Sequence, residues 1–177
     1  MTDNRTLVLS FWLIEKLNQL GTFLPQLGLR LLLAWEFWEA GLTKYQGENW
    51  FQPIRENFPF PFNIIPVEMS WFLATWFELI GAIALLIGLG TRFFTVSLMI
   101  LTITAMATVH LPSEWTNLTH LFTTGYDVCD SEGGNFKIPL IYLVLFLPLL
   151  FNGPGKASFD HLIQLFLTRP NPKDIHK

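Results

Sequence analysis

The chain has 177 residues, of which 51% are hydrophobic and 14% are charged, whereas about a quarter of the residues in ordinary soluble domains are charged. Its formal net charge of −3 excludes the strongly basic surfaces that bind nucleic acid. Cys129 is the only cysteine, which excludes an intrachain disulfide and a cysteine-only metal cluster, and the length predicts a single domain over residues 1–177.

The first predicted element is a helix over about residues 6–20. Leu7, Phe11, Ile14 and Leu17 recur at helical spacing, with polar residues between them. This stretch is too short and too polar to span a bilayer. We therefore expect an amphipathic helix that lies along the membrane surface.

Four predicted transmembrane helices follow, over about residues 24–44, 69–89, 91–110 and 136–152. Each stretch approaches the roughly 20 mostly apolar residues that a helix needs to cross the hydrocarbon core. The last three are nearly free of charge, with Glu78 as the exception within residues 70–90. The first contains Arg30, Glu36 and Glu39, so its assignment depends on the three spans after it. The predicted fold is all-α, an integral membrane four-helix bundle with flanking amphipathic interfacial helices.

Two long loops, at about 44–69 and 110–135, connect the spans on one side of the membrane. The first is rich in aromatic residues and holds four prolines, so we expect it to fold back over the bundle at the level of the lipid headgroups. After the fourth span, the Asn152–Gly155 turn leads to a second interfacial helix at about 158–168. Ser158 is its predicted first residue.

The distribution of Lys and Arg predicts the orientation, because basic residues concentrate in cytoplasmic segments. With the N-terminus inside, eight of the 11 fall on the cytoplasmic side: Arg5, Lys16, Arg30, Arg92, Lys156, Arg169, Lys173 and Lys177. Three fall outside: Lys44, Arg55 and Lys137. We therefore expect a multi-pass protein of the bacterial inner membrane with both termini in the cytoplasm.

Charged groups inside a bilayer are costly, at about 2.5–3.5 kcal/mol each, and are therefore candidate functional residues. With a rise of about 1.5 Å per residue, Glu78 lies about 15 Å deep and Arg30 about 21 Å deep, which predicts a buried pair between them. Such a pair either orients the bundle or serves proton or redox chemistry. Glu36 and Glu39 are further catalytic candidates, although their position near the outer interface also lets them reach headgroup water.

A copper(I) site is a separate hypothesis for the outer side. Met106 and His110 are four residues apart and share a helix face. His120 and Cys129 lie in the loop that follows, and thioether, imidazole and thiolate ligands together suit copper(I). The alternative is that Met106 fills space in the core.

Several short motifs resemble the DoxX family of small bacterial membrane proteins. They cover the chain from about Arg30 to Asp160, in the order expected of four spans. They are Arg30, Gly41 and Lys44, Glu78–Gly81, Leu86–Arg92, Gly153–Gly155, and Ser158 with Asp160. The segment Trp35–Gly41, the aromatic outer loop and the loop around Cys129 are similar to the DoxX branch found beside systems that mature copper-binding peptides.

The resemblance implies a redox or maturation accessory role, and its partners would be the lipid bilayer, the maturation enzymes and their peptide. Our leading hypothesis is an accessory protein for a copper-binding peptide that exchanges electrons with quinone, with Arg30 and Glu78 as contacts of the quinone oxygens. The alternatives are a non-enzymatic subunit that transports or assembles the peptide or copper, and a purely structural membrane protein. The sequence leaves open whether the protein is an enzyme and whether it forms a homo-oligomer.

Overall fold

The computed structural model describes residues 4–112, 114–126, 128 and 134–168, and every regular element in these ranges is helical. The all-α prediction is confirmed for this part of the chain. The α-helices are α1 (Asn4–Gly21), α2 (Leu24–Gln46), α3 (Val67–Ile87), α4 (Thr91–Ala105), α5 (Leu118–Thr124), α6 (Lys137–Asn152) and α7 (Phe159–Leu167). Three short helical turns complete the fold: η1 (Gln52–Asn57), η2 (Phe62–Ile64) and the π-helical η3 (Met106–His110), which continues α4.

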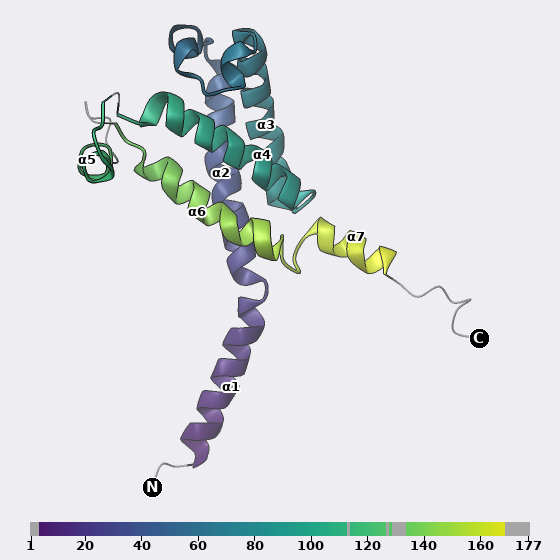
Figure 1. Ribbon diagram of the computed structural model, residues 1–177. Coiled ribbons are helices and arrows are strands. Elements are labelled where there is room, and N and C mark those ends of the chain that lie inside the picture. The colour runs from purple at the N-terminus through teal and green to yellow at the C-terminus, as the bar shows by residue number, and fades with distance from the viewer. Residues whose placement is uncertain (1–3, 113, 127, 129–133, 169–177) are drawn as a thin grey trace.

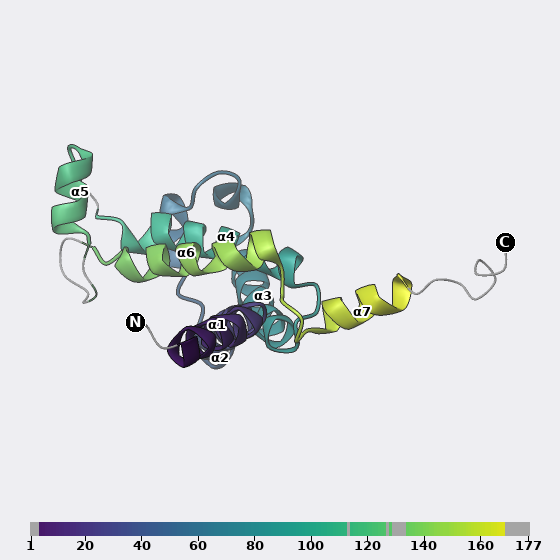
Figure 2. The same cartoon turned by 90° about the horizontal axis from the view of Figure 1, so that it is seen from below.

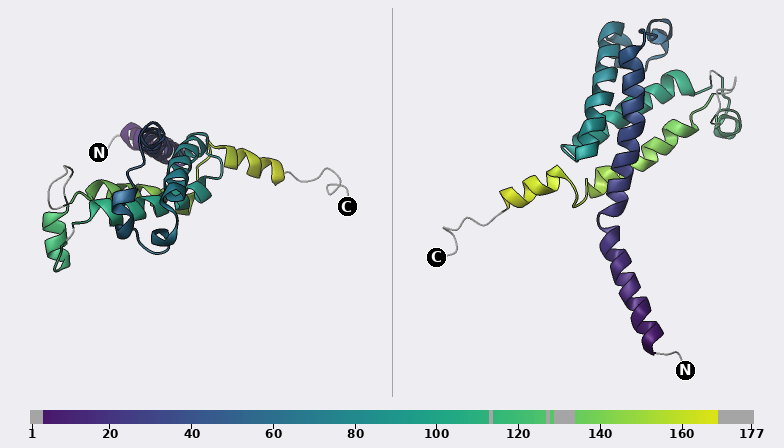
Figure 3. Two further views of the ribbon diagram at one scale, coloured as in Figure 1. Left: turned by 90° about the horizontal axis from the view of Figure 1, so that it is seen from above. Right: turned by 180° about the vertical axis from the view of Figure 1, so that it is seen from behind.

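Helices α2, α3, α4 and α6 pack around one core (Figure 1). Helix α3 lies along α2, and α4 packs on both α3 and α6. The α4–α6 pair runs obliquely to the α2–α3 pair, as views from the front and from behind both show (Figures 1 and 3). The core consists of apolar side chains from all four helices: Leu33, Ala34, Phe37, Ala82, Leu85, Leu98, Phe146 and Leu149.

Two helices are long and apolar enough to cross a membrane: α3, and the continuous Thr91–His110 segment formed by α4 and η3. Helix α6 is apolar but has 16 residues, and the 23 residues of α2 include four charges. Helices α2, α3 and α6, and α4 together with η3, begin and end within two residues of the predicted spans. The crossing of a membrane by all four helices stays a prediction.

The bundle has large apolar side chains on its outside, and several polar side chains are buried beside its apolar core. On α3, the large side chains of Phe72, Trp76, Ile80 and Ile83 are exposed. The buried polar residues are Arg30, Thr75, Glu78, Thr91, Thr95, Thr102, Thr108 and Ser158. Exposed apolar surface of this extent marks contact with another apolar phase or partner, and a hydrocarbon environment accounts for it.

The first long loop folds back over one end of the bundle, as its aromatic content predicted. Phe51 packs against Phe58 and Trp71, with ring centroids 5.3 Å and 4.9 Å apart. Phe51 and Phe58 also form a second apolar cluster with Val67 and Ala74 of α3. The loop therefore forms a packed aromatic cover on the bundle, held by the same face of α3 that enters the core.

Helices α1 and α7 extend away from the bundle. Helix α1 continues beyond the start of α2, and α7 projects from the end of α6 on the other side of the molecule (Figures 1 and 2). Large apolar side chains on both are exposed, including Phe11, Leu17, Phe159 and Phe166. Ser158 caps α7 by accepting a hydrogen bond from the His161 amide, at 3.1 Å, so this helix start is confirmed. The placement of α1 and α7 along a membrane surface stays a prediction.

Candidate functional site

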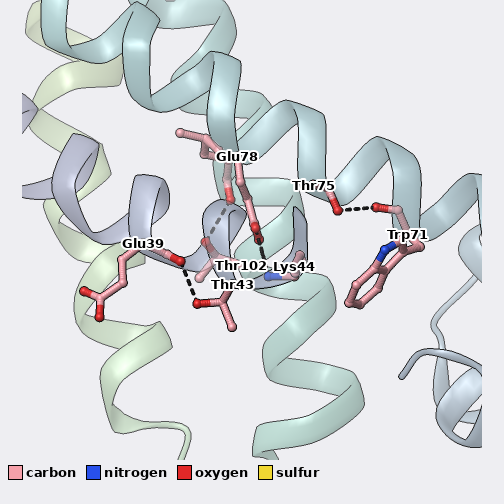
Figure 4. A network of polar contacts seen from close by, with 8 residues as sticks. Glu39, Thr43, Lys44, Trp71, Thr75, Glu78 and Thr102 are labelled. Carbon is pink, nitrogen blue, oxygen red and sulfur yellow. Dashed lines mark hydrogen bonds and ion pairs between the residues drawn. The ribbon is translucent and has the colours of Figure 1, made fainter. Parts of the chain in front are cut away.

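Glu78 forms an ion pair with Lys44 and not with Arg30. The Lys44 Nζ donates to Glu78 Oε1 at 2.9 Å and to Oε2 at 2.8 Å, and Figure 4 shows the two side chains meeting between α2 and α3. The pair is largely buried, since the side chains are 15% and 9% exposed. The predicted Arg30–Glu78 pair is therefore wrong.

The register between α2 and α3 explains the error, because the prediction set the outer ends of the first two spans at the same depth. In the structure, Gly41 packs against Glu78: a β-carbon on Gly41 would lie 3.1 Å from that of Glu78. Arg30 instead lies against Gly88, where an added β-carbon would be 2.9 Å from Arg30 Cζ. Gly88 is ten positions beyond Glu78, or about 15 Å along the helix.

Arg30 joins three segments at the other end of the bundle from Lys44. Its Nε donates to Leu85 O at 2.8 Å and its Nη2 to Leu86 O at 2.9 Å, both at the end of α3. Its Nη1 donates to Pro154 O at 3.0 Å and Ala157 O at 2.7 Å, in the turn between α6 and α7. The side chain is 2% exposed. Carbonyl oxygens thus satisfy the buried guanidinium, which connects α2 to α3 and to the turn before α7.

Asp160 joins α7 to the turn between α3 and α4. Its Oδ1 accepts from the Gly90 amide at 2.7 Å and its Oδ2 from the Thr91 amide at 2.9 Å. Its own amide donates to Gly88 O at 2.9 Å. Gly88 has φ +73°, and a β-carbon there would lie 2.6 Å from the Ser158 β-carbon. Only glycine fits at position 88. Arg30, Gly88, Ser158 and Asp160 therefore form one connected set of contacts that holds α2, the α3–α4 turn and the start of α7 together. We call these four residues the inner lock.

An apolar cavity of about 320 Å³ lies between the aromatic cover and the bundle. We call it the outer cavity. Its volume is at the lower end of the range of about 300–1,000 Å³ that is usual for ligand pockets. Aromatic rings of the first loop form one wall, and small residues of α3 and α4 form another. The lining residues include Lys44, Phe51, Ser70, Ala74, Glu78 and His110.

The polar groups of the outer cavity are few. Lys44 and Glu78 line it as an ion pair, and His110 lines it from the end of η3. The His110 Nδ1 is hydrogen-bonded to the Asn135 side chain. The Ser70 hydroxyl oxygen is buried without a hydrogen-bond partner. An apolar pocket with a few converging polar groups is the usual form of a small-molecule site.

A second cavity of about 180 Å³ adjoins the ion pair from the side of α6 and shares Lys44, Glu78 and His110 with the outer cavity. Glu36 and Tyr142 also line it, and the Tyr142 hydroxyl donates to Glu36 Oε2. Glu36 is thus held inside the bundle. The exposed Glu39 points away from the ion pair (Figure 4), as expected for a residue that reaches headgroup water.

The predicted copper ligands do not form a preassembled site among the described residues. His110 is bonded to Asn135, and His120 lies on the short exposed helix α5. Cys129 is outside the described residues. Within the ranges that the structure describes, no three side chains among His, Cys, Asp and Glu gather as metal ligands would. Copper binding by Met106, His110, His120 and Cys129 therefore stays a prediction.

Comparison with known proteins places these features in a family. The model of the DoxX family matches residues 26–111, which include α2, α3, α4, η3 and the aromatic cover. A protein of Haemophilus influenzae, described as uncharacterized, is 43% identical over 149 residues, which are 84% of this chain and 89% of that relative. No solved structure matches the chain. The matched family region contains Arg30, Lys44, Glu78 and most of the outer-cavity lining.

Proposed function

Because this chain belongs to the DoxX family, we propose that it is a bacterial inner-membrane protein that binds a quinone in the outer cavity and supports redox chemistry there. The observation that carries the proposal is a mostly apolar cavity whose lining includes the buried Lys44–Glu78 pair. A quinone ring is flat, apolar on its faces and accepts hydrogen bonds at two oxygens. The lining offers matching groups.

The residues divide into those that surround the ring and those that bind its oxygens. Phe51 and Ala74 belong to the second apolar cluster, line the cavity and would contact the faces of the ring. The Lys44 ammonium and the Ser70 hydroxyl would donate to ring oxygens, and Ser70 has no other partner. The Glu78 carboxylate accepts from Lys44 and would receive a proton that a bound hydroquinone releases on oxidation by the partner enzyme.

A bound quinone supplies two-electron, two-proton chemistry. The chain has no motif for binding haem or flavin, so the proposal assigns the electron exchange to a partner enzyme. Arg30 was predicted as a quinone contact, but its donors are taken by backbone carbonyl oxygens. The proposal therefore rests on Lys44, Glu78, Ser70 and His110.

Quinone content tests this proposal. The protein is purified in mild detergent, extracted with organic solvent and analysed for quinone by mass spectrometry. Wild type should retain quinone, and Ser70→Ala and Lys44→Gln should each retain several-fold less. Lys137→Gln, which removes a lysine beside Tyr126 and outside the cavity lining, is the matched control. Absence of quinone from wild type, or equal content in all four proteins, would contradict the proposal.

We further propose that this site serves the maturation of a copper-binding peptide. Support comes from the similarity of Trp35–Gly41 and of the aromatic outer loop to the DoxX branch that accompanies such systems. The mass of the secreted peptide, compared between wild-type and deletion cells, tests the proposal. If deletion cells secrete the peptide without the mass changes seen in wild type, the result supports a role of this protein in modifying the peptide. A peptide retained unsecreted in the cytoplasm supports the alternative of a transport or assembly subunit.

A further inference from the structure

A second basin, of about 590 Å³, lies at the opposite end of the bundle from the outer cavity. It is formed by the start of α4, the turn after α6 and the first residues of α7, and we call it the inner basin. Its lining is more polar than that of the outer cavity. The lining residues used below are Arg92, Phe93, Lys156, Asp160, His161 and Ile163.

The side chains available to a ligand in the inner basin are basic. Arg92, Lys156 and His161 line it, and Asp160 is the one acidic residue among the lining residues. Each oxygen of the Asp160 carboxylate already accepts a hydrogen bond from a backbone amide. Arg92 uses one donor, since its Nη2 donates to Phe151 O at 3.2 Å. Among the described residues, the other Arg92 donors and the exposed Lys156 ammonium have no hydrogen-bond acceptor, so they can bind an anion.

The Arg92 guanidinium lies beside Gly153 in the turn after α6. A β-carbon on Gly153 would lie 3.6 Å from Arg92 Nη2 and 3.8 Å from Nε, so the planar group lies over this glycine. Gly153 has φ +79°, a conformation that other residues rarely adopt. The Arg92 guanidinium therefore lies at the turn after α6, and a planar guanidinium is well suited to bind two phosphate oxygens at once.

Apolar residues at the same site favour a lipid over a free ion. Phe93 and Ile163 line the inner basin and are 62% and 44% exposed. Helix α7, which contributes Ile163 to the basin, continues this surface with the exposed Phe159, Leu162 and Phe166, and it projects from the bundle (Figure 2). An amphipathic helix with this distribution lies at the boundary between headgroups and acyl chains. The basic groups then lie at headgroup level.

We propose that the inner basin binds the headgroup of an anionic phospholipid, with Arg92 and Lys156 on the phosphate. The acyl chains would lie against Phe93 and Ile163. This site is separate from the outer cavity and does not depend on quinone binding. It gives the protein a preference among membrane lipids at the end that holds the inner lock.

Lipid binding to the purified protein in detergent tests this inference. Dioctanoyl phosphatidylglycerol is titrated while native mass spectrometry counts bound lipid, with dioctanoyl phosphatidylcholine and inorganic phosphate in parallel. The double variant Arg92→Gln with Lys156→Gln should bind phosphatidylglycerol about 30-fold more weakly, since each basic residue near anionic lipid contributes about fivefold in affinity. Arg55→Gln with Lys137→Gln makes the same charge change near the other end and should bind normally.

The variants also separate a binding defect from a folding defect. Lys156 is exposed, so Lys156→Gln alone should fold as wild type does and still bind phosphatidylglycerol several-fold more weakly. Equal affinities in the basin and control variants would overturn the inference, as would equal affinities for phosphatidylglycerol and phosphatidylcholine. Displacement of the lipid by a comparable concentration of inorganic phosphate would overturn the assignment to a lipid. Quinone content should be unchanged in every basin variant.

Discussion

A lysine and a glutamate inside a helical bundle destabilise the fold unless each satisfies the other. Lys44 and Glu78 do so with two short contacts, and both also line the outer cavity. The same pair therefore contributes to stability and provides the charged groups of the candidate site. Loss of either partner leaves an uncompensated charge in apolar surroundings, which typically costs about 3–5 kcal/mol.

Double-variant measurements test this pairing. Lys44→Met and Glu78→Leu should each lower the midpoint of thermal unfolding in detergent strongly, and the double variant should be less harmful than their sum. Arg30→Met combined with Glu78→Leu is the comparison, and these effects should add, because the two residues share no partner. Losses for Lys44 and Glu78 that sum to the double loss would contradict the ion pair.

Arg30 should tolerate no replacement, including the conservative one. Its planar guanidinium reaches four carbonyl oxygens on two segments, and a lysine, with three donors on one nitrogen, cannot match that geometry. We expect Arg30→Lys to destabilise the protein by at least about 2 kcal/mol, because hydrogen bonds to charged groups are worth about 1.5–3 kcal/mol each. Arg55→Lys, on the exposed η1, is the control. An unfolding midpoint for Arg30→Lys equal to that of wild type would contradict a stabilising role for the Arg30 hydrogen bonds.

The sequence predicted which residues are costly to bury, but not their partners. Arg30, Glu36 and Glu78 stand out as charges in apolar runs, and all three have bonded partners inside the bundle. Lys44 was interpreted as the end of a span, because its position in the sequence does not show the relative shift of α2 and α3. Gly41, three residues before the end of the predicted span, is the residue in the sequence that could have indicated a close approach of these helices.

At the scale of elements, the turn between α3 and α4 and the start of α7 form one unit through Asp160. Its carboxylate accepts hydrogen bonds from the Gly90 and Thr91 amides, at the start of α4. Asp160 therefore acts as an N-terminal cap that a helix distant in the sequence supplies. This contact also fixes the position of α7 against the bundle. The same unit borders the inner basin.

Substitution of Asp160 tests that unit. Asp160→Ala should lower stability by about 1–2 kcal/mol, the usual cost of losing a helix cap, and Asp160→Asn should cost less because one oxygen remains as an acceptor. Thermal unfolding in detergent measures both, with the exposed Glu56→Gln as the control. Equal stability of Asp160→Ala and wild type would contradict the role of Asp160 as a cap.

Helix bounds were predicted well, whereas helix register and short helices were not. Long apolar runs flanked by Gly, Pro and charges define the ends of α2, α3 and α6, and of α4 together with η3, within two residues. Helix α5 was missed because its seven residues lie in a polar loop, although Asn117 caps it by accepting from the His120 amide at 2.8 Å. The inner lock and the outer cavity depend on contacts between segments far apart in the chain, which periodicity does not reveal.

At the scale of the whole molecule, the proposed topology places the outer cavity on the periplasmic side and the inner basin on the cytoplasmic side. Alkaline phosphatase is active only in the periplasm. A fusion after Asn117 should therefore be active and a fusion after Arg92 inactive, because most Lys and Arg residues lie on the side of Arg92. The opposite pattern would reverse the orientation, and activity at both positions would remove the span between them.

The outer cavity unites the buried ion pair, the aromatic cover and the proposed quinone, so filling it tests the account most directly. Ala74 lines the cavity and is 6% exposed, and Ala74→Phe would occupy the space while keeping Lys44 and Glu78. Overpacking costs about 1–3 kcal/mol, so thermal unfolding is measured to establish that the variant folds. Ala107→Phe adds the same volume at an exposed position of η3 outside the cavity lining.

The measurement is the affinity of purified protein for a short-chain ubiquinone, followed by quenching of tryptophan fluorescence. Wild type and Ala107→Phe should bind with the same affinity, and Ala74→Phe should bind at least about tenfold more weakly, the equivalent of about 1.4 kcal/mol. Equal affinity in all three proteins, or no binding to wild type, would contradict a quinone site in the outer cavity.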